Sequence, residues 1–101
     1  MADTFRIVFH RNDENLHLKL FGDFDGHSAF KLLKVLKNSA FCMSRIFIHT
    51  AGVNFISPSA VDTFKKNLSV LSEMPISIVF TGKYAEQLTP RIGKSFQVMQ
   101  C

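Results

Sequence analysis

The chain has 101 residues, 47% of them hydrophobic, and carries a formal net charge of +4. This length suits a single domain spanning residues 1–101, and the apolar fraction is enough for a hydrophobic core. No apolar run approaches the roughly 20 residues of a membrane span, and the N-terminal stretch "MADTFRIVFH" does not read as a secretory signal. We therefore expect a soluble cytoplasmic protein.

The cysteines and histidines show no metal-binding spacing. Cys42 and Cys101 form no CxxC pair, and the four histidines are scattered over the chain at positions His10, His17, His27 and His49. We expect free thiols, histidines that are solvated or hydrogen-bonded singly, and no metal or other cofactor.

The twelve basic residues are spread along the chain, with the closest groupings at Lys31, Lys34 and Lys37 and at Lys65 and Lys66. Lysines at this spacing usually form the solvent-facing side of a helix. Charge alone therefore gives only weak support for a nucleic-acid-binding module.

The first 21 residues have the pattern of a β-hairpin. The runs "FRIVFH" and "LHLKLF" flank the polar cluster "RNDEN", which is typical of two strands and a turn. In the second run Leu16, Leu18 and Leu20 alternate with His17 and Lys19. Alternation places the three leucines on one face of the strand, and helices are expected to cover that face.

The stretch "GDFDGHSAFKLLKVLKN" predicts the first amphipathic helix. Its apolar residues recur at helical spacing, and its lysines fall on the opposite side. Asp25, Gly26 and Ser28 suit the helix start, and Asn38 and Ser39 suit its end. The apolar positions are Ala29, Leu32, Leu33 and Leu36.

The next run, "RIFIHT", is apolar almost throughout, as in a central strand that is buried on both faces. "AGVNFIS" is expected to be a loop. A second amphipathic helix follows, with Ser57 as its N-cap and Pro58 in its first turn, and with Met74 and Pro75 at its end. Its apolar side is formed by Val61, Phe64, Leu68 and Leu71.

The remaining chain predicts a strand at "ISIVF", a break at "TG", a short helix at "KYAEQLT" ending near Pro90, and a last edge strand at "KSFQVMQ". The resulting fold class is α/β. It has a mixed sheet of four to five strands with an N-terminal antiparallel hairpin and amphipathic helices.

In such sheets, binding sites usually lie where strands lead into helices. Three turns, "GDFDGHS", "TAGVNFISPS" and "TGKYA", are expected to converge there. They present Asp23, Asp25, His27, Ser57, Ser59, Thr81 and Lys83. Ser59, in the first turn of its helix, is well placed to carry a phosphate, because the free backbone N–H groups favour an anion. A plain capping role is the alternative.

An enzyme is not predicted. Asp25, His27 and Ser59 could approach one another at this rim, but no G-x-S-x-G elbow or Gly-rich phosphate loop is present.

Two stretches, in this order of elements, resemble the STAS domain family, which has the anti-sigma factor antagonist fold. The first family pattern is a strand followed by Gly, an acidic residue, an apolar residue, Asp, two free positions, Ser or Thr, and Ala. It is filled here by Gly22, Asp23, Phe24, Asp25, Ser28 and Ala29. The second, V-x-F-I-D-S-S-G, is matched by Val53, Phe55, Ile56 and Ser59.

The resemblance implies that Ser59 is the phosphoacceptor and that Asp25 is the loop aspartate beside it. It also implies that the helix beginning there docks a partner. The chain departs from the pattern at three positions: Ser57 replaces Asp, Pro58 replaces the first serine, and Ala60 replaces Gly. The lost carboxylate removes a negative charge beside the acceptor, and Ala60 adds a methyl group.

The function implied is that of a small bacterial signalling phosphoprotein in transcription regulation, without catalytic activity. It would bind an anti-sigma factor or a switch kinase with an ATPase fold under control of serine phosphorylation. The candidate rim residues are Asp23, Asp25, Ser57, Pro58, Ala60, Thr81 and Gly82, together with the acceptor Ser59. The alternative is a constitutive docking subunit of a transporter ATPase, and a basic nucleic-acid-binding module is a further one.

Overall fold

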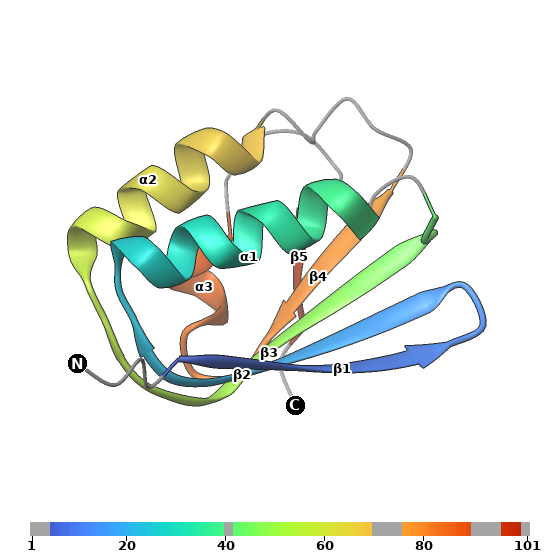
Figure 1. Cartoon of the computed structure of the whole chain (residues 1–101), viewed down its shortest axis with the longest axis horizontal. Helices are drawn as coiled ribbons and strands as arrows, with labels where there is room; N and C mark the ends of the chain where they lie inside the picture. The colour runs from blue at the N-terminus through green and yellow to red at the C-terminus, as the bar shows by residue number, and fades with distance from the viewer. Residues whose placement is uncertain (1–4, 40–41, 70–75, 90–95, 100–101) are drawn as a thin grey trace.

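The structure is a computed structural model that describes residues 5–39, 42–69, 76–89 and 96–99. Five strands and three helices follow one another in the predicted order (Figure 1). They are β1 (Arg6–Asn12), β2 (Asn15–Phe24), α1 (Gly26–Ser39), β3 (Arg45–Ile56), α2 (Pro58–Leu68), β4 (Ser77–Thr81), α3 (Ala85–Leu88) and β5 (Phe96–Met99).

The N-terminal hairpin is confirmed. β1 and β2 pair antiparallel from Arg6 opposite Phe21 to Asn12 opposite Asn15, so the strands extend into the polar cluster and leave a two-residue turn. Leu16, Leu18 and Leu20 are all buried, because alternation directs them to the side that the helices cover.

The strands form one sheet in the order β1-β2-β3-β4-β5. β2 to β5 run parallel to their neighbours, and only the β1–β2 pair is antiparallel. The predicted mixed sheet is therefore confirmed with five strands, including the predicted last edge strand β5.

The helices lie on one side of this sheet, with α1 and α2 side by side over it (Figure 1). The core fills the space between the two layers. Phe24 and Phe80 of the sheet meet Phe64 of α2 edge to face, with ring centroids 5.6 and 6.2 Å apart. All three side chains are fully buried, and burial of each contributes roughly 1.5–3 kcal/mol.

The prediction for β3 was wrong in two respects. Its burial alternates along the strand, with Phe47 and His49 only half-buried, because the described helices cover one face alone. The strand also continues through the expected loop to Ile56, where it pairs with the end of β2. Gly52 allows this close approach, since an added Cβ there would lie 2.6 Å from the Leu20 carbonyl oxygen.

α2 begins as predicted, with Ser57 at the N-cap and Pro58 in the first turn, and it ends at Leu68. Several predicted positions lie outside the described residues: Leu71 on the apolar side of α2, Met74 and Pro75 at its end, and Pro90 at the end of the short helix. Among the helices that the structure describes, none combines the length and apolarity that a membrane crossing requires.

Candidate functional site

Two of the three predicted turns meet where β2 and β3 end. The Ser57 backbone N–H donates a hydrogen bond of 2.9 Å to the Phe24 carbonyl oxygen, so the start of α2 lies against the turn that leads into α1. This contact brings the segment from Asp23 to Asp25 beside the segment from Ser57 to Ser59. Asp23, Asp25 and Ser59 are exposed, and Ser57 is half-buried.

Asp25 serves as the N-cap of α1. Its Oδ1 accepts a hydrogen bond from the Ser28 backbone N–H at 3.0 Å and lies 3.0 Å from the Ser28 hydroxyl. That hydroxyl is also 2.8 Å from the Asp23 carbonyl oxygen. The Ser28 backbone N–H, then the Ser28 hydroxyl, stabilise the carboxylate and lower the pKa of Asp25 below its ordinary value. The carboxylate is therefore ionised and held in place by the helix that it caps.

Ser57 and Ser59 contact each other. Their hydroxyl oxygens are 3.1 Å apart, and the Ser57 side chain makes no capping hydrogen bond to the backbone of α2. Ser57 is thus at the N-cap position, while its hydroxyl is directed to Ser59 instead. Asp25 and Ser59 both make their side-chain hydrogen bonds with serines, so these are not the contacts of a Ser-His-Asp relay.

A groove with a mixed apolar and polar lining lies next to Ser59 along the chain. A pocket of about 280 Å³ is lined by Ile56, Pro58, Val61, Lys65 and Gln87. Next to it along the chain, the Phe55 side chain is 56% exposed. Ala60, in contrast, is 1% exposed, so its methyl group belongs to the core. The surface around Ser59 therefore combines a hydroxyl with uncovered apolar area.

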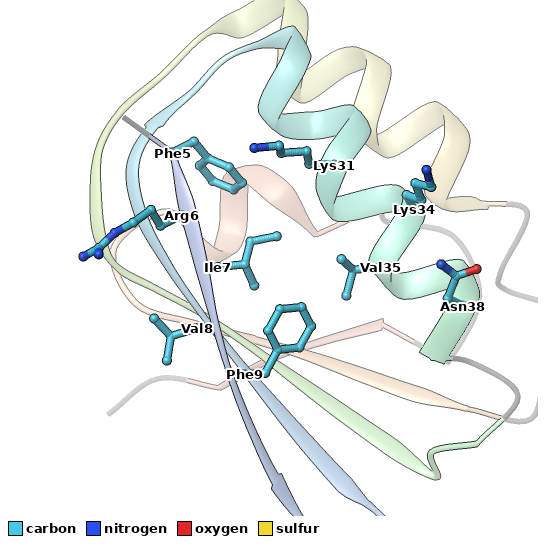
Figure 2. Close-up of a pocket in the computed structure, with 9 residues that line it drawn as sticks. All are labelled: Phe5, Arg6, Ile7, Val8, Phe9, Lys31, Lys34, Val35 and Asn38. Carbon is cyan, nitrogen blue, oxygen red and sulfur yellow. The ribbon is translucent and has the colours of Figure 1, made fainter. Parts of the chain in front are cut away.

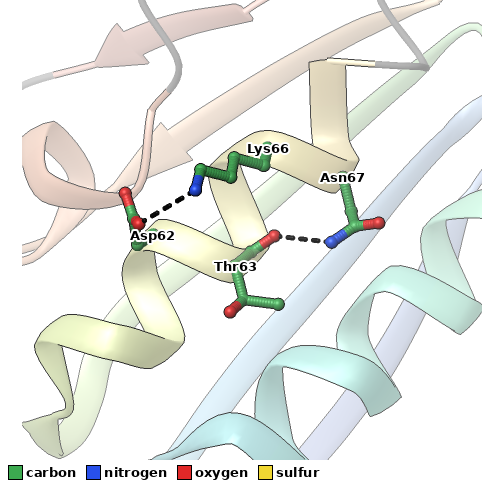
Figure 3. A network of polar contacts seen from close by, with 4 residues as sticks. All are labelled: Asp62, Thr63, Lys66 and Asn67. Atoms are coloured by element: carbon green, nitrogen blue, oxygen red, sulfur yellow. Dashed lines mark hydrogen bonds and ion pairs between the residues drawn. The ribbon is translucent and has the colours of Figure 1, made fainter.

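The outer side of α2 is polar. Lys66 Nζ lies 3.4 Å from Asp62 Oδ2, and the Asn67 side-chain amide donates a hydrogen bond of 2.8 Å to the Thr63 carbonyl oxygen (Figure 3). Both interactions follow i,i+4 spacing on an exposed helix face and contribute little to stability. This face gives α2 a hydrophilic border beside the groove.

The third turn meets β3 before that strand ends, and its Tyr84 hydroxyl donates a hydrogen bond of 3.4 Å to the Asn54 carbonyl oxygen. The Thr81 hydroxyl is 2.7 Å from His49 Nδ1, and an added Cβ on Gly82 would lie 2.5 Å from Thr50 Oγ1. Lys83 lies over the Tyr84 ring at 5.4 Å. The contacts of Thr81 and Gly82 are with the middle of β3, and roughly 20 Å of extended chain separates Thr50 from Ser57.

A histidine cluster on the open face of the sheet was not predicted. His17 Nδ1 is 2.9 Å from His49 Nε2, and both rings stack in parallel with Phe47. Burial, and next the charge of His17, lower the pKa of His49. The alternation in "LHLKLF" places His17 on the polar side of its strand, and this was the only sequence signal for the cluster. The register between β2 and β3, which brings His17 next to His49, cannot be read from the sequence pattern. No group of three possible ligands close enough for a metal occurs among the described residues.

Solved structures with the same architecture identify the fold. The anti-sigma factor antagonist SpoIIAA in its unphosphorylated form superposes with a TM-score of 0.60 at 15% sequence identity, covering 96% of this chain and 88% of that one. This chain has the anti-sigma factor antagonist fold.

A second structure with the SpoIIAA-like fold agrees. An uncharacterized protein of the DUF3478 family from Shewanella loihica PV-4 gives a TM-score of 0.57 at 18% identity, covering 98% of this chain and 90% of that one. The sequence itself matches no protein-family model and no curated protein. At 15% and 18% identity the similarity shows the fold and does not show the role of Ser59.

Proposed function

We propose that this protein is a non-catalytic regulator that binds a protein partner through the start of α2, under the control of phosphorylation at Ser59. The partner class that the STAS resemblance implies is an anti-sigma factor or a switch kinase with an ATPase fold. The observation that carries the proposal is the position of Ser59: an exposed hydroxyl that follows Pro58, a lining residue of the groove with Ile56 and Val61, in a chain with the SpoIIAA-like fold.

The surroundings of Ser59 favour a phosphate. Ser59 is the second residue of α2, where backbone N–H groups lack intrahelical acceptors and the helix dipole favours negative charge. The Ser57 hydroxyl, 3.1 Å from the Ser59 hydroxyl, can donate a hydrogen bond to a phosphate oxygen. An aspartate at position 57 would instead repel the phosphate, so the replacement of Asp by Ser favours the phosphorylated state once it forms.

A phosphate at Ser59 would oppose docking on the groove. A partner that covers Ile56, Pro58 and Val61 must remove water from the neighbouring position 59. A group carrying about two negative charges is costly to desolvate. Phosphorylation would therefore weaken binding without a change of fold.

The test is the capture of partner proteins from native cells by tagged wild-type protein and by the Ser59→Asp variant. We expect Ser59→Asp to lose most of the partner that wild type retains. Thr63→Asp is the matched control, because it adds the same charge one helical turn further along α2 and should retain the partner. Thermal unfolding checks that each variant is folded. Equal capture by a folded Ser59→Asp variant would contradict the switch.

Constitutive docking on a transporter ATPase is the second candidate, and the changes in the motif favour it. Ser57 lacks the carboxylate of the family pattern, and the buried Ala60 replaces its glycine, so a kinase that reads that pattern would find neither feature. In that case Ser59→Ala and Ser59→Asp would both retain the partner.

A further inference from the structure

β1 forms one edge of the sheet and is poorly covered. It is the first strand in the sheet order, and six of its seven residues are exposed, the exception being Ile7. In an antiparallel pair every second residue directs its backbone N–H and C=O away from its partner strand. The edge of β1 therefore presents a row of donors and acceptors to which a further strand can bind.

A groove follows this edge on the helix side. It has a volume of about 600 Å³ and lies between β1 and α1. Figure 2 shows Ile7 and Phe9 pointing from β1 toward α1, where they face Val35, while Arg6 and Val8 point away from the helix. Phe9 is 55% exposed although it shares a face with the buried leucines of β2. The apolar layer of the core thus continues to the edge strand β1, where no segment of the described residues covers Phe9.

All charged residues that line the groove are basic. Its nine lining residues include the cations Arg6, Lys31 and Lys34 and no acidic residue. Among the described residues, no carboxylate lies within ion-pair distance of Lys34. On the other side of β1, Arg6 lies over the Phe21 ring at 5.9 Å. A strand added to this edge would therefore have cations near both of its faces.

We propose that the edge of β1 and the adjoining groove bind an extended acidic segment of a partner protein as an added β-strand. Backbone hydrogen bonds to the edge supply affinity, and alternate side chains of the segment cover Phe9 and Val35. In a segment that alternates apolar and acidic residues, the acidic side chains then lie on the opposite face and pair with Arg6, while the charge of Lys34 attracts the segment from the helix side. The seven residues of β1 accommodate a segment of about seven residues.

A second copy of this chain fits the edge less well. Antiparallel pairing of two β1 strands would place the basic ends of "RIVFHRN" against each other, with Arg6 of one copy near Arg11 of the other. Directly opposed like charges destabilise strand pairs. The acidic partner is therefore the better occupant.

This site is separate from the surface around Ser59. The groove lies on the side of α1 that faces β1, and α2 packs against α1, so the two surfaces can be tested independently. Variants of the groove leave Ser59 intact, and variants of Ser59 leave the groove intact.

The probe for the test is the fluorescein-labelled heptapeptide EVEVEVE, titrated against the full chain by fluorescence anisotropy. Two control peptides separate the contributions: KVKVKVK reverses the charge, and EVEPEVE interrupts strand hydrogen bonding with proline. We expect EVEVEVE to bind saturably, with a dissociation constant below about 1 mM. We also expect both controls to bind at least about tenfold more weakly.

Matched variants locate the site. Lys34→Glu and Phe9→Ser should each weaken EVEVEVE binding about tenfold or more. The control variants are Lys37→Glu on the same helix and Phe30→Ser, whose side chain is 68% exposed. Both residues lie outside this groove, so these variants should not change the affinity for EVEVEVE. Circular dichroism verifies that the variants are folded.

Three outcomes would overturn the proposal: undetectable binding of EVEVEVE, equal binding of KVKVKVK, or an unchanged affinity of Lys34→Glu for EVEVEVE. So would a dimer of wild-type chains that Phe9→Ser dissolves, since the occupant would then be a second copy.

Discussion

Asp25 and Ser57 occupy equivalent positions before α1 and α2, yet only Asp25 caps its helix through its side chain. The Asp25 carboxylate holds two groups of Ser28, whereas the Ser57 hydroxyl lies against Ser59. The sequence predicts a capping role for Ser57 because serine before proline is a common helix start. In the structure the Ser57 hydroxyl contacts the Ser59 hydroxyl instead of the helix backbone. A local sequence pattern does not reveal this competing contact.

We expect Asp25→Ala to lower the melting temperature clearly and Ser57→Ala to change it much less. Loss of a capping side chain usually costs about 1 kcal/mol, and Ser57→Ala should cost less than about 0.5 kcal/mol because no capping bond is lost. Thermal unfolding of the two variants tests this. A larger loss for Ser57→Ala than for Asp25→Ala would contradict the assignment.

His49 makes stability depend on pH. Burial, followed by the charges of His17 and Lys19, lowers its pKa in the folded state, while the unfolded chain keeps a value near 6.5. Between the two values the unfolded state binds more protons, so stability rises with pH. The stabilisation is complete above about pH 6.5 and is lost as the pH falls through the lower, folded pKa.

The matching prediction is that the free energy of unfolding decreases on acidification from about pH 7.5 to about pH 5. His49→Gln should make this decrease smaller. Urea unfolding at several pH values gives the slopes, and identical slopes for wild type and His49→Gln would refute the prediction.

At the scale of elements, the close approach of the turn after β4 to β3 depends on Gly82. This residue has φ of +97°, and an added Cβ would lie 2.5 Å from Thr50 Oγ1 and 2.7 Å from the Ala51 backbone nitrogen. The Thr50 hydroxyl donates a hydrogen bond to the Thr81 carbonyl and accepts one from the Tyr84 backbone N–H. The turn is thereby fixed to β3.

We expect Gly82→Ala to lower the free energy of unfolding by at least about 2 kcal/mol, through backbone strain and the contact with Thr50. Gly26→Ala is the matched control, because no atom lies within 4 Å of the added Cβ and the change should stay within about 0.5 kcal/mol. Denaturant unfolding compares the two. A cost for Gly82→Ala no greater than for Gly26→Ala would show that the turn can relax.

The order and type of the elements could be predicted from local patterns, since alternation at Leu16, Leu18 and Leu20 and helical spacing in α1 are local properties. The extension of β3 through "AGVNFI" could not, because Gly52 and Asn54 have loop-like propensities and pairing with β2 outweighs them. The meeting of Asp25 and Ser57 near one rim followed from topology. The separate position of Thr81 depends on the extra length of β3.

For the whole molecule, the sheet is covered by helices on one face and has β1 at one edge. The core explains the fold that this chain shares with SpoIIAA at 15% identity, because apolar residues at the same spacing can differ in identity and still pack the same layers. Function then depends on surface residues. The two surfaces to which we assign proposed functions, Ser59 at the start of α2 and the groove along β1, lie on different sides of α1.

The most direct test of the central claim is to measure the phosphate occupancy of the peptide containing Ser57 and Ser59 in protein purified from native cells, separately for the partner-bound and the free pools. The account predicts phosphate on Ser59 in the free pool and a bare Ser59 in the bound pool. Ser59 without phosphate in both pools, with a stable partner present, would contradict the switch and leave constitutive docking as the function.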